Sequence, residues 1–80
     1  MPDYQSTVQA VVSAIVNEHV ERNSDLLAKV GKDQFLINHI LDVLEGQGYL
    51  KLEKFGTGQW EVSRVSVKLR RAFGAGQIDA

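Results

Sequence analysis

The 80-residue sequence contains no cysteine and only one proline. Without cysteine, the chain can form neither a disulfide framework nor a thiolate metal site. Its longest uncharged stretch, residues 4–17, is interrupted by Gln, Ser and Thr, so we expect no membrane-spanning segment. No basic segment followed by an apolar one marks a signal peptide. We therefore expect a cytoplasmic location.

An excess of charge of one sign is also missing, because nine Lys and Arg oppose ten Asp and Glu. Hydrophobic residues make up 44% of the chain and charged residues 24%. This composition is too apolar for a disordered chain, and the length allows one domain with a single small core. The short length excludes a two-domain enzyme with a cleft between its lobes. We expect one domain over residues 1–73 and a flexible tail or linker over residues 74–80.

Apolar residues at helical spacing predict a first helix over residues 3–20, with Asp3 or Ser6 as its N-cap. Many of these residues are β-branched and therefore poor intrinsic helix formers, so the helix depends on burial of its apolar stripe. The predicted stripe comprises Val8, Val11, Val12, Ile15, Val16 and His19.

Two further helices are predicted before residue 48. Ser24 is the expected N-cap of a helix over residues 25–30, which ends at Gly31. Asp33 is the expected N-cap of the next helix, which runs to about Gln47. Its apolar residues recur at i, i+3, i+4 and i+7 and predict the buried face. These residues are Ile37, Ile40, Leu41 and Leu44.

After Gly48 the apolar residues alternate, which is typical of strands. Two alternating runs, residues 50–53 and 60–63, are joined by a glycine-containing loop and predict a β-hairpin with Trp60 as its aromatic anchor. A last short helix is predicted from about Val65, with Ser63 or Ser66 as its N-cap.

This order of elements resembles the winged-helix family, in which a helix-turn-helix is followed by a hairpin called the wing. The matching strings are residues 25–31, the apolar set of the third helix, Gly-Gln-Gly-Tyr-Leu at 46–50 and Trp-Glu-Val-Ser at 60–63. The resemblance implies an α+β fold, a small winged helix-turn-helix. It consists of a three-helix bundle, a two-stranded β-hairpin wing and a short C-terminal helix. The family's fold binds both DNA and protein partners. The sequence also resembles the N-terminal dimerisation region of some small-molecule methyltransferases, which share this wing pattern.

A DNA-binding member would place its third helix in the major groove and its wing on the phosphate backbone. In this chain Gln34 and Asn38 would read bases, and the phosphates would be held by Lys51, Lys54 and Arg64. The third helix opposes this assignment, because residues 33–48 carry three acids and no Lys or Arg. Phosphate neutralisation supplies most of the affinity for duplex DNA, so such a helix would be repelled.

The third helix carries a second apolar stripe, formed by Phe35, His39 and Val43 and bordered by Leu36. One interpretation is that these side chains pack against the first helix or the wing. The other is that they face solvent and bind a protein.

Charge is unevenly distributed, with a net −4 over residues 1–50 and +3 over residues 51–80. The basic half indicates either a solvated face or an anionic partner.

We find no arrangement typical of catalysis, metal binding or cofactor binding, and we expect a non-enzymatic domain without cofactor or small-molecule substrate. The first hypothesis is a recognition module for protein–protein association, either self-association or docking in a larger assembly. It would act through the apolar faces of the third and first helices. The alternative is a DNA-binding transcriptional regulator. A third hypothesis is that the chain is the dimerising end of a methyltransferase.

Overall fold

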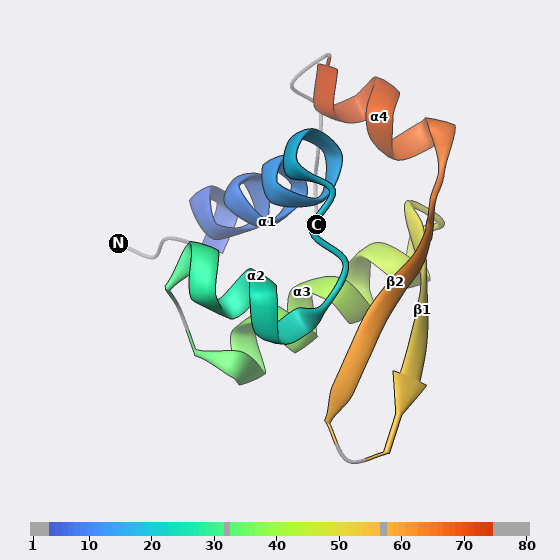
Figure 1. The fold of residues 1–80 in the computed structure, drawn as a ribbon. Helices are drawn as coiled ribbons and strands as arrows, with labels where there is room; N and C mark the ends of the chain where they lie inside the picture. Colours follow the sequence, from blue (N-terminus) through green and yellow to red (C-terminus); the bar gives the residue numbers. More distant parts are fainter. Residues whose placement is uncertain (1–3, 32, 57, 75–80) are drawn as a thin grey trace.

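The computed structural model describes residues 4–31, 33–56 and 58–74. Three helices are followed by an antiparallel hairpin and a short helix, as predicted, in the α+β winged-helix layout (Figure 1). The elements are α1 (Tyr4–Glu18), α2 (Asn23–Val30), α3 (Gln34–Gly46), β1 (Leu50–Phe55), β2 (Gln59–Val65) and α4 (Val67–Gly74). The candidate N-cap Asp3 and residues 75–80 of the expected tail lie outside the described residues.

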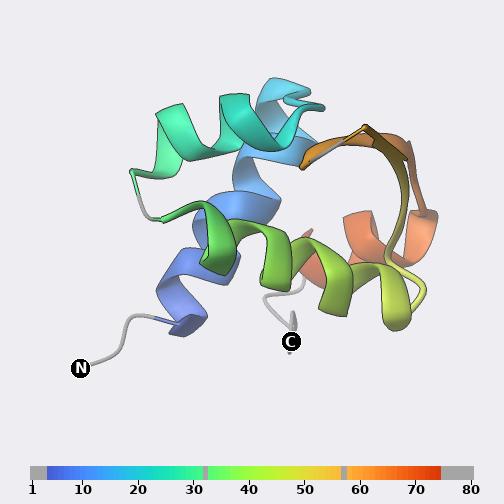
Figure 2. The same ribbon diagram turned by 90° about the horizontal axis from the view of Figure 1, so that it is seen from below.

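The core lies where the helices meet the hairpin. Helices α2 and α3 pack against each other, and the hairpin lies beside the C-terminal end of α3 (Figures 1 and 2). The four residues predicted as the buried face of α3 are all fully buried, together with one residue of α4 and several of α1 and α2. The fully buried apolar side chains are Val8, Val11, Val12, Leu26, Ile37, Ile40, Leu41, Leu44 and Leu69.

Helix α1 ends earlier than the apolar spacing predicts. It stops at Glu18, and His19 is exposed with a left-handed backbone (φ 58°). The prediction that the helix runs to residue 20 with His19 in its buried stripe is therefore wrong. The physical reason is the turn at His19, which redirects the chain so that Val20 can enter the core. The Val20 amide donates to the Ala14 carbonyl at 3.2 Å.

Helix α2 starts two residues before the predicted position. Its N-cap is Arg22, which makes no side-chain capping bond, so the prediction of Ser24 as N-cap is wrong. The preceding residues lie extended beside β2: Arg22 is bridged to Glu61, and the Val62 amide donates to the Glu21 carbonyl at 2.7 Å. This pairing, rather than a local cap, sets the start of the helix.

The predicted alternation is confirmed in β1, whereas in β2 Trp60 and Glu61 are both half-buried. Leu50 and Leu52 are buried whereas Lys51 and Glu53 are exposed. The pairing is irregular between Lys51, which is opposite Arg64, and Leu52, which is opposite Val62. One residue of β2 is thus left over at a β-bulge, and bulges commonly re-aim neighbouring side chains.

The end of β2 differs from the sequence prediction. Val65 was expected at the start of the last helix, but it pairs with Leu50 and belongs to the strand. Pairing with β1 half-buries this side chain, and this outweighs its fit to the helical pattern. Of the two candidate caps, Ser66 is confirmed, because its hydroxyl accepts from the Leu69 amide at 3.3 Å.

Candidate functional site

Helix α3 is held in a defined rotation, which determines the side chains that it presents. Its first turn is capped by Asp33, whose Oδ1 accepts from the Leu36 amide at 2.8 Å. Its buried face anchors one side of the helix in the core. The prediction of this orientation is confirmed, so the residues on the other sides of α3 can be assigned to solvent or to neighbours.

The four residues predicted to bind protein form what we call the α3 face: Phe35, Leu36, His39 and Val43. Phe35 is 89% exposed, the highest value among the exposed large hydrophobic side chains of the described residues. His39 is also exposed, whereas Leu36 and Val43 are half-buried. The interpretation that Phe35 packs against the first helix or the wing is therefore wrong, and only its neighbours Leu36 and Val43 are partly enclosed.

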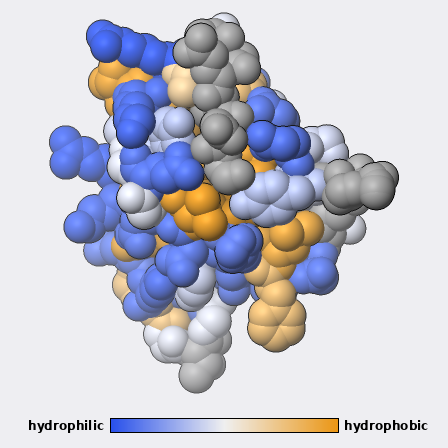
Figure 3. Space-filling view, turned by 180° about the vertical axis from the view of Figure 1, so that it is seen from behind, coloured by the Kyte–Doolittle hydropathy of each residue, from blue (hydrophilic) through white to orange (hydrophobic). Residues whose placement is uncertain are grey.

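Helix α1 borders the α3 face. The ring of Tyr4 lies 6.2 Å from the ring of His39, centroid to centroid, at a tilt of 57°. Tyr4 is half-buried and packs against the core. On the side of the molecule opposite to the view of Figure 1, apolar patches alternate with hydrophilic side chains (Figure 3). The structure thus brings the N-terminal turn of α1 beside α3, as the hypothesis of a shared apolar face requires.

The acidic residues of α3 have different surroundings. Asp42 pairs with the Lys54 ammonium group at 3.4 Å, and a Glu45 carboxylate oxygen accepts from the Leu52 amide at 2.9 Å. Both contacts tie α3 to the hairpin. Asp33 is exposed and uses one oxygen as the helix cap. The Asp33 carboxylate is therefore exposed two residues before Phe35, and Lys32, which precedes it, lies outside the described residues.

The two residues predicted to read bases are engaged inside the domain. The Gln34 amide donates to the Asn23 carbonyl at 3.3 Å and to the Asn38 Oδ1 at 3.2 Å. The Asn23 Nδ2 also donates to the Asn38 Oδ1, at 3.0 Å. Gln34 and Asn38 are both half-buried, and both are hydrogen-bonded to Asn23 of α2. This arrangement leaves little of either side chain available to a base edge.

Asn23 is the residue at the centre of this network, and the sequence analysis missed it. It is 2% exposed. Its Nδ2 donates to the Gly58 carbonyl at 2.9 Å, and its Oδ1 accepts from the Trp60 amide at 3.2 Å. No local signal could have revealed this role, because those partners lie 35 and 37 positions further along the chain.

The residues predicted to hold phosphates fall into two groups. Lys54 is paired with Asp42, and its ammonium group lies 4.2 Å from the centre of the Trp60 ring. Trp60 is half-buried and packs against the core, as expected of the hairpin's aromatic anchor. Lys51 and Arg64 are exposed cross-strand partners. Within residues 4–31, 33–56 and 58–74, no carboxylate forms an ion pair with Lys51 or Arg64.

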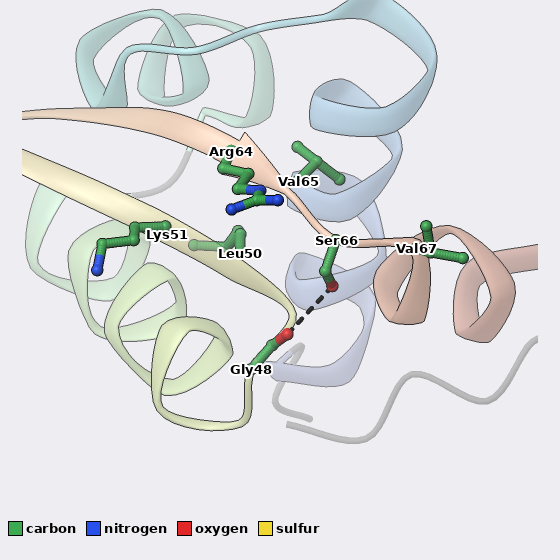
Figure 4. Close-up of a pocket in the computed structure, with 7 residues that line it drawn as sticks. All are labelled: Gly48, Leu50, Lys51, Arg64, Val65, Ser66 and Val67. Carbon is green, nitrogen blue, oxygen red and sulfur yellow. Dashed lines mark hydrogen bonds between the residues drawn. The ribbon is translucent and has the colours of Figure 1, made fainter.

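Lys51 and Arg64 belong to a hollow of about 350 Å³ at the base of the hairpin, which we call the basic hollow. Its lining includes Leu50, Lys51, Arg64, Val65, Ser66 and Val67. Figure 4 shows these side chains on the ends of β1 and β2 and at the start of α4. The Ser66 hydroxyl has two carbonyl acceptors for its one hydrogen, that of Tyr49 at 2.7 Å and that of Gly48 at 3.1 Å, and either bond ties the start of α4 to the segment before β1.

No group of three or more His, Asp or Glu side chains in the described segments is arranged to hold a metal ion. No helix among these segments has the length and apolar character needed to cross a membrane.

Comparison with known proteins gives no further assignment. No protein-family model, curated protein or solved structure significantly matches this chain.

Proposed function

We propose that this domain is a non-catalytic winged-helix recognition module that mediates protein–protein association through the α3 face and the adjoining part of α1. The observation that carries the proposal is the 89% exposure of Phe35 on a helix whose other apolar residues are buried or half-buried. Covering a solvent-exposed phenyl ring with a partner lowers the free energy, because apolar surface is removed from water. We also propose a cytoplasmic location, which suits a domain without cysteine.

The surroundings of Phe35 favour a protein over a nucleic acid as the partner. Residues 33–46 contain Asp33, Asp42 and Glu45 but no Lys or Arg. The helix itself therefore offers duplex DNA no cation to neutralise phosphates. Gln34 and Asn38, which would have to read the bases, hold each other and Asn23 instead.

The proposal can be tested by replacing Phe35 with a photoreactive benzophenone amino acid and irradiating cells that express the chain. We expect a covalent adduct with protein, formed from position 35 but not from the matched exposed position Phe55. The variant His39→Asp, which places a charge on the same exposed face, should greatly reduce the adduct. Adducts with nucleic acid, or equal protein adducts from both positions, would contradict the proposal.

A second candidate function is DNA binding led by the wing. It is favoured by one observation, that Lys51 and Arg64 are exposed and have no carboxylate partner among the described residues. Binding of this kind would depend on phosphate contacts, so its affinity would fall steeply with salt. The contacts of Gln34 and Asn38 give it little base specificity.

A further inference from the structure

The three exposed large apolar side chains of the described residues have different surroundings. Phe35 extends from the first turn of α3, whereas Phe55 ends β1. Val67, at the start of α4, is 61% exposed and lines the basic hollow (Figure 4). Phe35 is therefore an apolar projection, and Val67 is an apolar wall of a depression on the same molecule.

The basic hollow has room for an aromatic side chain. Its volume is about 350 Å³, and an apolar cavity of about 150 Å³ already holds benzene. Leu50, Val65 and Val67 supply apolar lining. A phenyl ring inserted there would cover the exposed part of Val67 as well as its own surface.

The charges around the two features are complementary. Lys51 and Arg64 are cross-strand partners at the hollow, and both side chains are exposed, so the hollow carries two positive charges. No carboxylate in the described segments forms an ion pair with either of them. Asp33, two residues before Phe35, is exposed and has one carboxylate oxygen beyond its capping bond. A ligand with a phenyl ring and a nearby carboxylate could place its ring in the hollow and its carboxylate beside Lys51 and Arg64.

From this complementarity we infer that the chain associates head to tail with a second copy of itself. Phe35 of one copy enters the basic hollow of the next, and Asp33 lies beside Lys51 and Arg64. The inference rests on the proposed function, because it identifies the partner of the α3 face. The two surfaces lie near opposite ends of α3, which has 13 residues and is about 20 Å long, so they do not overlap on one copy.

A contact of this kind joins two different surfaces. An assembly of any length therefore keeps one free Phe35 at one end and one free basic hollow at the other, and further copies can add to it. The mass measured by sedimentation should therefore rise with concentration beyond twice 8.9 kDa. Phe35→Ala and Val67→Glu should each weaken self-association at least tenfold, and Phe55→Ala should leave it unchanged. Both target side chains are mainly exposed, and a Glu at the start of α4 suits the helix dipole, so both variants should fold. Circular dichroism melting curves check this.

The decisive experiment mixes two variants that are monomeric alone. The Phe35→Ala chain keeps an intact basic hollow, and the Val67→Glu chain keeps an intact Phe35. An equimolar mixture should form a dimer and no larger species, because only one productive contact remains. With the Phe35→Ala chain labelled for NMR, the shifts should fall on Lys51, Arg64 and Ser66 rather than on α3.

Two results would overturn head-to-tail association. One is a wild-type chain that stays monomeric at about 1 mM, where even weak association is detectable. The other is a wild type that associates while the mixed variants do not, because Phe35 would then have another partner surface. In both cases the photochemical adduct from position 35 decides separately whether the proposed protein-binding function survives.

Discussion

The Nδ2 of Asn23 donates a 3.0 Å hydrogen bond to the Oδ1 of Asn38, which joins the first residue of α2 to the middle of α3. The same nitrogen donates to the Gly58 carbonyl in the hairpin. One buried side chain thus holds three parts of the fold together. It also holds Asn38 and Gln34 by hydrogen bonds, whereas Phe35 and His39 of the α3 face are exposed.

Replacement of Asn23 should destabilise the whole domain. Asn23→Ala leaves the amide of the half-buried Trp60 without its acceptor, and a buried polar group left unsatisfied costs about 1–3 kcal/mol. We expect a loss of that size in the free energy of unfolding, measured by urea denaturation with Trp60 fluorescence. The control is Asn17→Ala, because Asn17 is exposed and its side chain donates to the Ser13 hydroxyl one turn earlier in the same helix. An equal stability loss in both variants would contradict the claim that the hydrogen bonds of Asn23 stabilise the domain.

The two predicted helix caps should differ in their effect on stability. Asp33→Ala removes the acceptor of the Leu36 amide and should lower the free energy of unfolding by about 1 kcal/mol. Ser24→Ala should change it by less than about 0.5 kcal/mol, because Ser24 is exposed and lies inside α2 rather than at its N-cap. Thermal unfolding of both variants checks this, and a larger loss for Ser24→Ala would contradict the observed start of α2.

Phe35 should matter for association and not for folding. Phe35→Ala removes a side chain that is already in water, so the free energy of unfolding of the monomer should change by less than about 0.5 kcal/mol. Leu41→Ala, a change in the fully buried face of the same helix, should cost about 2–5 kcal/mol. Denaturation at low protein concentration separates the two effects. A core-sized loss for Phe35→Ala would mean that the ring is buried in the monomer.

The DNA hypothesis makes its own prediction. If the wing holds phosphates, Lys51→Glu/Lys54→Glu should weaken duplex binding strongly and reduce its dependence on salt. Fluorescence anisotropy with duplex DNA at several salt concentrations measures both quantities. Because the Asn38 side chain is hydrogen-bonded to Asn23 and Gln34, Asn38→Ala should leave the affinity of the folded domain unchanged in the same titration, with folding checked by circular dichroism. Normal DNA affinity in the double variant would contradict phosphate binding by the wing.

The sequence by itself determined the order of the elements and the buried face of α3. Apolar residues spaced three and four apart bury one side of a helix, and alternating residues bury one face of a strand, so Ile37, Leu44 and Leu52 lie where their spacing puts them. Asp33 as a cap and Gly31 as a left-handed helix end also follow from local chemistry.

Tertiary structure decided the features that depend on distant partners. The start of α2 follows from pairing of residues 21–22 with β2, the role of Asn23 from groups in the hairpin loop, and the end of β2 from pairing of Val65 with Leu50. For the same reason, the exposure of Phe35 could not be predicted from the sequence. A stripe at helical spacing is compatible with both core and surface, and only the positions of α1, α2 and the hairpin decide whether anything covers it.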